Sequence, residues 1–164
     1  MIFVTVGSQM PFDRMVMAMD EWAQANPAKQ VFAQIGQSQL RPAHMKFCEA
    51  LSPGEFRAHV ASAEIIVAHA GMGSVLTALE YSKTLVLLPR RGDLRETRND
   101  HQLATVRWLA QKRGIEVAME TVDLPEALNR ALGAAPTVAT VASPPADALV
   151  LFLSGYLDQV GRGD

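Results

Sequence analysis

The sequence predicts an α/β fold, a Rossmann-like parallel sheet with helices on both faces. Short apolar runs, several rich in β-branched residues, recur along the chain and alternate with segments of helical periodicity. Strands that are apolar throughout are typical of a parallel sheet that is buried on both sides. The chain has 164 residues, 49% hydrophobic and 20% charged, so we expect one domain with a sizeable core.

The first half of the chain is predicted to form strands at residues 2–6, 30–35 and 46–51 and helices at 12–25 and 53–61. The second helix opens with Ser52 and Pro53, which suit a cap and a first helical position. An apolar stripe at helical spacing marks the core-facing side of the first helix, and it consists of Phe12, Met15, Val16, Met19, Trp22 and Ala23.

The second half predicts strands at residues 64–68, 84–88 and 115–119. A helical pattern that includes Val75, Leu76 and Leu79 follows the first of these strands. Further helices are expected at 102–112, with Gly114 as a stop signal, and at 124–132. Two strand-to-helix loops of this half therefore lie at the same edge of the sheet, where open α/β sheets bind their ligands.

The first of these loops contains glycines and runs from His69 to Ser74. Glycine lets the backbone approach a ligand closely, and the first N–H groups of the following helix have no partner within the helix. Because these N–H groups also carry the positive end of the helix dipole, the loop predicts a phosphate-binding site. Ser74 could cap the helix or bind the phosphate.

The second loop, residues 89–98, is rich in arginine. Two interpretations are open: a solvated loop, or a loop in which an arginine meets a diphosphate or a lipid phosphate. Arg98 ranks highest among the four because it is close to Asp100, and Asn99 or Asp100 is a candidate cap for the next helix. The arginines of this loop are Arg90, Arg91, Arg95 and Arg98.

Together, these segments resemble the C-terminal, donor-binding domain of the family-28 glycosyltransferases. The motifs that carry the resemblance are the block from His69 to Ser74, Glu80, Lys83 and Pro89, and then the run from Asn99 to Gln102. The opening residues 1–9, with Phe12, Asp13 and Arg14, resemble single-domain relatives, namely the soluble subunit of the endoplasmic-reticulum N-acetylglucosamine transferase and similar bacterial exopolysaccharide or capsule subunits. The resemblance implies the C-terminal half of a GT-B fold.

The resemblance also implies roles for particular residues. The donor diphosphate would be bound by Gly7, Ser8, Gly71, Met72, Gly73 and Ser74. The sugar and ribose contacts would come from Thr77, Glu80, Asp100 and Gln102, and further cleft candidates are Gln9, Arg98, Asn99 and His101. Many family members have a ribose-binding Glu where this chain has Thr77, so Glu80, one turn later, is the alternative. His69 is the candidate catalytic residue.

As a function, the resemblance implies inverting, metal-independent transfer of a sugar from a UDP-sugar to a lipid-linked saccharide, with the UDP-sugar as co-substrate and no cofactor. A GT-B enzyme has two domains, so a membrane-anchored partner subunit would supply the acceptor half. One alternative is a non-catalytic accessory subunit that binds nucleotide-sugar and activates a partner transferase. The other, an NAD(P)-binding oxidoreductase, is weaker because Leu76 stands at the third glycine position of G-x-G-x-x-G.

Composition bears on which molecules the protein binds and on where in the cell it works. The net charge is −2 and the pI is near 6.1, which argues against a nucleic-acid protein. Cys48 is the single cysteine, as in proteins of a reducing compartment, and no secretory signal or run of about 20 apolar residues is found. We therefore expect a cytoplasmic protein that reaches the inner membrane through its partner.

Three segments are expected from this pattern. Residues 1–132 form the donor nucleotide-sugar-binding domain, and residues 133–145, rich in Ala, Pro, Thr and Ser, form a linker. Residues 146–164 form a C-terminal helix that packs on the domain or on a partner.

Overall fold

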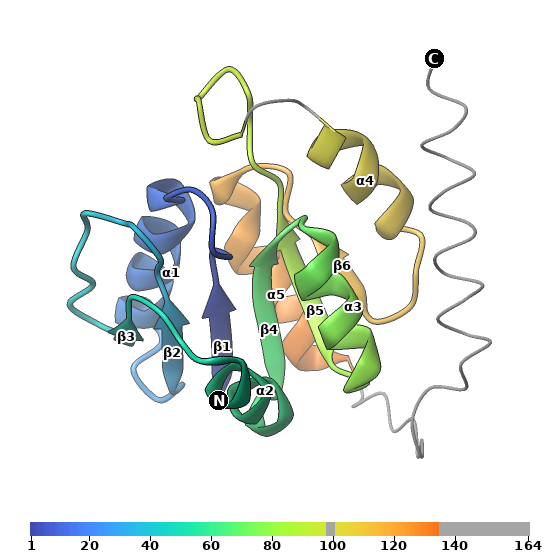
Figure 1. The fold of residues 1–164 in the computed structure, drawn as a ribbon. Helices are drawn as coiled ribbons and strands as arrows, with labels where there is room; N and C mark the ends of the chain where they lie inside the picture. The colour runs from blue at the N-terminus through green and yellow to red at the C-terminus, as the bar shows by residue number, and fades with distance from the viewer. Residues whose placement is uncertain (98–100, 135–164) are drawn as a thin grey trace.

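The computed structural model describes residues 1–97 and 101–134, and for residues 101–104 it describes the backbone alone. Within these residues the chain forms one six-stranded sheet with the strand order β3-β2-β1-β4-β5-β6, and every neighbouring pair is parallel. The predicted α/β class is thus confirmed, and Figure 1 shows the sheet with α3 in front of it and α5 behind it.

The elements follow the predicted alternation of strand and helix. The strands are β1 (Ile2–Thr5), β2 (Val31–Gln34), β3 (Lys46–Cys48), β4 (Ile65–His69), β5 (Thr84–Leu88) and β6 (Ile115–Val117). The helices are α1 (Asp13–Ala25), α2 (Pro53–Ser62), α3 (Met72–Glu80), α4 (His101–Leu109) and α5 (Leu124–Gly133), with a short 3-10 helix η1 (Thr121–Asp123) before α5.

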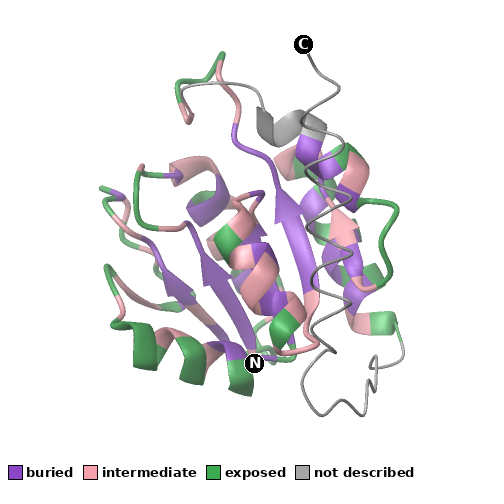
Figure 2. Cartoon of the chain, turned by 45° about the vertical axis from the view of Figure 1, so that its right-hand side comes forward, coloured by how far each residue is buried: buried purple, intermediate pink, exposed green. Residues whose placement is uncertain are grey.

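Side chains alternate between the two faces of the sheet along each strand, so each face packs in an apolar layer of its own. On one face α1 and α5 pack against strand residues such as Val4, Val67 and Val86. On the other face α2, α3 and α4 cover residues such as Ile66 and Leu87. The four inner strands β1, β2, β4 and β5 are accordingly buried along nearly their whole length, whereas the edge strands and the outer faces of the helices are more exposed (Figure 2).

Several boundaries differ from the prediction. The edge strands β3 and β6 end at Cys48 and Val117, earlier than the apolar runs suggested, because an edge strand pairs on one side alone. Helix α3 begins at Met72, so Met72, Gly73 and Ser74 belong to its first turn and not to the preceding loop. Helix η1 was not predicted. The predicted linker from residue 135 onward and the C-terminal helix lie outside the described residues.

The strand order reverses between β1 and β4. The chain runs from β1 outward to β2 and β3 and then returns to place β4 on the other side of β1. In open α/β sheets such a switch point leaves a crevice beyond the carboxyl ends of the two central strands. The loops after β1 and β4 border this crevice, which places the candidate site.

Candidate functional site

A cleft of about 1180 Å³ opens at the carboxyl ends of the strands. It extends from Glu49–Leu51, after β3, past the loops that follow β1 and β4, to Arg90, Glu96 and Thr97, after β5. The predicted residues that line it are Gly7, Ser8, Gln9, His69, Gly71, Gly73, Ser74, Thr77 and Glu80. The structure thus brings together most of the residues that the sequence placed in one site.

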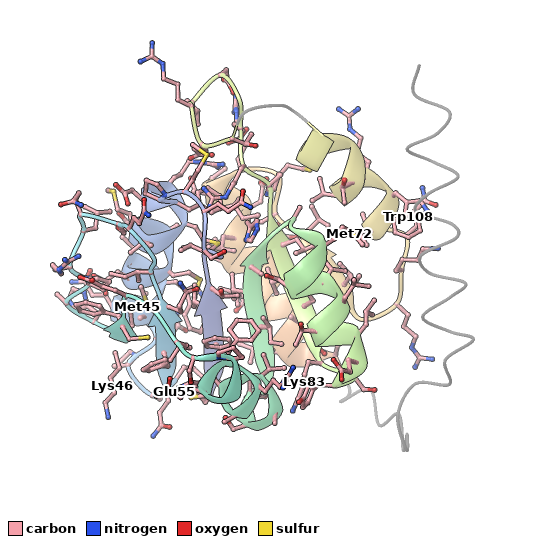
Figure 3. All side chains as sticks on the ribbon, viewed as in Figure 1. Met45, Lys46, Glu55, Met72, Lys83 and Trp108 are labelled. Carbon is pink, nitrogen blue, oxygen red and sulfur yellow. The ribbon has the colours of Figure 1, made fainter. Side chains whose placement is uncertain are left out.

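The described structure does not place the remaining predicted residues in the lining of the cleft. Met72 begins α3 (Figure 3) but is not among the residues that line the cleft. Arg98, Asn99 and Asp100 lie outside the described residues, and so do the side chains of His101 and Gln102 at the start of α4. Their predicted contacts with the sugar stay predictions.

The loops after β1 and β4 meet at the imidazole ring of His69. A Cβ atom on Gly71 would lie 2.1 Å from Nε2 of this ring, and a Cβ atom on Gly7 would lie 2.5 Å from Cε1. Gly7 also has φ +78°, a conformation that residues with a side chain rarely adopt. Both glycines are therefore needed for packing against His69, which was not expected from their phosphate-binding role alone.

The N-terminus of α3 lies open at the centre of the cleft. Its N-cap residue is Gly71, and no side chain makes a capping hydrogen bond there. Ser74 is the third residue of the helix and does not cap it, so the capping role predicted for it is not observed, and its predicted role in phosphate binding stays a prediction. Gly73 faces open space, with no atom within 4 Å of where a Cβ would stand. The first-turn N–H groups of α3 are thus placed to meet a ligand.

Thr77 and Glu80 continue the cleft wall along α3. The Thr77 hydroxyl donates a hydrogen bond of 2.9 Å to the Gly73 carbonyl, whereas Glu80 is exposed. Lys83, which follows the C-terminal end of α3 (Figure 3), donates to the carbonyls of Ala61 and Ala63 and so ties this end to the end of α2. The lysine of the family motif is structural in this chain.

A buried polar network holds the β1 loop from the side of β2. The Thr5 hydroxyl donates to Oε1 of Gln34 at 2.7 Å, and Nε2 of Gln34 donates to the carbonyls of Gly7 and Glu49. Thr5 and Gln34 are buried, and their polar atoms are paired, as buried polar groups generally are. Sequence reasoning missed both residues, although a glutamine ending an otherwise apolar strand was a usable signal.

Arg90 holds the same loop from the side of β5. Its Nη2 donates to the carbonyls of Val6 and Met10 at 2.6 and 2.7 Å, and its Nη1 donates to those of Pro11 and Glu96 at 2.7 and 3.0 Å. Arg90 is 4% exposed. Neither predicted role of the arginine-rich loop, solvation or phosphate binding, describes this residue. It fixes the shape of the cleft instead.

The pKa of His69 is lowered to about 4. Burial disfavours the imidazolium ion, and the nearby charge of Arg90 adds to this effect. Nδ1 of the ring is buried and has no hydrogen-bond partner among the described residues. At neutral pH the ring is neutral and a weak base, which limits its strength in the predicted catalytic role.

The α2 side of the cleft was also missed. Phe56 and Arg57 line this wall together with Leu51, and Arg57 is exposed. They belong to a helix whose sequence carries no recognisable ligand motif, so only the packing of α2 on the sheet could reveal them. Phe56 packs edge-on against Phe3 of β1, with ring centroids 5.5 Å apart.

Comparison with known families decides the classification of this domain. The family model for the glycosyltransferase family 28 C-terminal domain matches residues 1–143. The chain belongs to this family. None of the curated proteins matches the chain in sequence.

Solved structures agree with this family 28 domain in fold. The glycosyltransferase of kitacinnamycin matches with a TM-score of 0.59 and 19% identity over 84% of this chain and 36% of its own. CalG4, the calicheamicin glycosyltransferase, matches with a TM-score of 0.57 and 19% identity over 80% of this chain and 33% of its own. Acinetobacter baumannii MurG matches with a TM-score of 0.52 and 20% identity over 79% of this chain and 39% of its own. The chain thus spans about a third of these proteins, and its fold matches the C-terminal half of GT-B glycosyltransferases.

Among the described residues, no His, Cys, Asp and Glu side chains are grouped so that they could hold a metal ion. In the same part of the chain, no helix has the length and apolar character needed to cross a membrane.

The contact between Gly71 and His69 gives a first prediction. We expect Gly71→Ala to lower the free energy of unfolding by about 1–3 kcal/mol, because its methyl group would collide with the imidazole ring. The φ of Gly71 is −86°, so backbone strain does not contribute. In a His69→Ala background the same substitution should cost almost nothing, since the ring is gone. Urea denaturation of the four proteins measures both values.

Gly73→Ala is the matched control, because it adds a methyl group in open space two residues away. It should not lower the free energy of unfolding in either background. An equal cost of Gly71→Ala with and without the ring would contradict the proposed packing.

The lowered pKa of His69 gives a second prediction. A histidine whose pKa falls from 6.5 in the unfolded chain to about 4 in the folded one makes the protein less stable as the pH falls through this window. Between pH 7 and pH 4 the wild type should lose about 3 kcal/mol more of its free energy of unfolding than His69→Gln. Parallel stability curves for the two proteins, measured by urea denaturation at a series of pH values, would refute this assignment.

Proposed function

We propose that this chain is the donor-binding, catalytic subunit of a two-component glycosyltransferase. It would move a sugar from a UDP-sugar to a lipid-linked saccharide in bacterial exopolysaccharide or capsule biosynthesis, with inversion and without a metal ion. The observation that carries the proposal is the open N-terminus of α3 at the switch point of a family 28 domain.

The shape of the cleft suits an extended nucleotide-sugar. If the diphosphate lies at the start of α3, after β4, the two ends of the donor extend toward β3 and toward β5. Phe56 and Leu51 offer apolar surface for a planar base at the β3 end. Glu96 and Thr97 give the β5 end a polar wall that suits a sugar. Thr77 and Glu80 lie along α3, where the ribose would pass.

The chemistry follows from where charge develops. Inverting displacement at the anomeric carbon passes through an oxocarbenium-like transition state, and negative charge grows on the departing diphosphate. First-turn N–H groups of α3, on Gly73 and Ser74, would stabilise this charge without reorganising, and Gly7 and Ser8 face them from the β1 loop. His69 is the candidate base within this chain, although its pKa of about 4 makes a base from the partner a strong competitor.

The acceptor half of the site would come from elsewhere. The chain spans about a third of the GT-B structures it matches, which supports a second domain that would close the cleft. We propose that a membrane-anchored subunit supplies this domain and binds the lipid-linked acceptor, so that the complex works at the cytoplasmic face of the inner membrane.

Calorimetric titration tests the donor site. We expect the purified chain to bind UDP equally well with and without magnesium, and Gly73→Val to abolish binding by filling the space where the diphosphate would lie. Gly54→Val is the matched control: Gly54 is also the second residue of a helix and faces open space, but it does not line the cleft. It should leave UDP binding unchanged.

The same titration with NAD and with a panel of UDP-sugars separates the alternatives. Binding of NAD but not of UDP would exclude the transferase. The UDP-sugar bound most tightly would identify the donor, and activity of the complex with its partner would then distinguish a catalytic from an accessory subunit.

A further inference from the structure

Arginine hydrogen bonds link two loops of the cleft, the loop after β1 and the loop after β5. Arg90 follows β5 and donates to carbonyls of the β1–α1 loop, including those of Val6 and Met10. Arg14 follows the β1–α1 loop and donates to Pro89 and Glu96 of the β5–α4 loop. Since β4 lies between β1 and β5, these contacts join the loops on either side of the point where α3 begins. The β5–α4 loop stands beyond the carboxyl ends of the strands (Figure 1).

The two arginines differ in what they bind. Arg90 is held by main-chain carbonyls, whereas Arg14 forms a bidentate pair with the Glu96 carboxylate, with both N···O distances at 2.8 Å. The Arg14 and Glu96 side chains are 17% and 11% exposed, so the pair is largely shielded from water. Both guanidinium groups lie over the ring of Phe12, at 4.6 Å for Arg90 and 5.3 Å for Arg14.

Glu96 is the point where these contacts converge. One of its carboxylate oxygens also accepts the N–H of Arg91 at 3.0 Å, and its carbonyl accepts from Arg90. The carboxylate is thus engaged mainly with the protein itself. Glu96 and the adjacent Thr97 nevertheless line the cleft at its β5 end, so any shift of Glu96 moves that wall.

We propose that Arg14 and Glu96 form a positioning pair that sets the wall of the cleft facing the donor sugar. The inference rests on the proposed function, in which the sugar lies at the β5 end and the diphosphate at the start of α3. Removing one partner breaks the bidentate pair in a place largely shielded from water. Arg14 would be left with the Glu120 carboxylate at 3.6 Å and the Pro89 carbonyl, and Glu96 with the Arg91 N–H, so we expect the loop to shift toward better solvation of the remaining charge. The pair therefore governs binding of the sugar more than binding of the diphosphate.

Titration of the whole chain with two ligands tests this pair. The ligands are UDP and the UDP-sugar that the wild type binds best, and the variants are Glu96→Gln and Arg14→Lys. Affinity for the UDP-sugar should fall about tenfold in Glu96→Gln while affinity for UDP changes less than about twofold. Arg14→Lys keeps the charge but loses the bidentate geometry, and it should give a smaller change in the same direction.

A more exposed ion pair outside the cleft provides a control for the loss of an arginine at a carboxylate. Arg130 of α5 bonds Glu116 of β6 at 2.8 Å, and Arg130→Lys should change neither affinity. Combining Arg14→Lys with Glu96→Gln should weaken UDP-sugar binding no further than the stronger single variant, because the two residues act through one another.

The outcomes separate this inference from the proposed function. A wild-type chain that fails to bind UDP refutes the proposed function before any variant is measured. Equal losses of UDP and UDP-sugar affinity in Glu96→Gln would show a general structural role and overturn the inference. The inference would also be overturned if the ratio of the two affinities were the same in Glu96→Gln as in the wild type, or if the wild type bound the UDP-sugar no more tightly than UDP.

Discussion

The cleft depends on the contact of one imidazole ring with two glycine backbones. His69 ends β4, and its ring occupies the space that a Cβ atom on Gly7 or Gly71 would need. The reversal of strand order brings these two loops side by side, and the absence of side chains on the glycines lets them close on the ring. Helix α3 starts directly after this contact, so packing sets the position of its N-terminus relative to the β1 loop.

Buried polar groups stabilise the same arrangement from both sides. Gln34 reaches the β1 loop from β2, and Arg90 reaches it from β5, so hydrogen bonds to its carbonyls come from opposite directions. Leaving such groups unpaired would be costly, which makes the network an all-or-none constraint on the loop. A cleft wall held in this way needs little reorganisation when charge develops beside it, and electrostatic catalysis depends on that property.

Charge is distributed unevenly around the cleft. Arg14, Arg90 and Arg91 lie near its β5 end, but each is engaged with carbonyl or carboxylate groups of the protein. In the proposed function the diphosphate therefore relies on the N-terminus of α3 more than on these cations. Ser8, Gln9 and Arg57, by contrast, are exposed at the cleft, and in the proposed function they are available to the domain that would close over it.

The sequence by itself determined the α/β class, the order of strands and helices, and the loops that carry the ligand motifs, because these depend on local periodicity and on glycine-containing turns. It could not determine the order of the strands within the sheet, which places the β1 and β4 loops together, since that order depends on contacts between residues far apart in the chain. For the same reason the sequence presented Arg90 as solvated or ligand-bound, offered only a polar residue in an apolar strand as a signal for Gln34, and contained no signal for Phe56 or for the Arg14–Glu96 pair. Whether a polar side chain meets a ligand or its own backbone is decided by the burial and the partners that tertiary packing supplies.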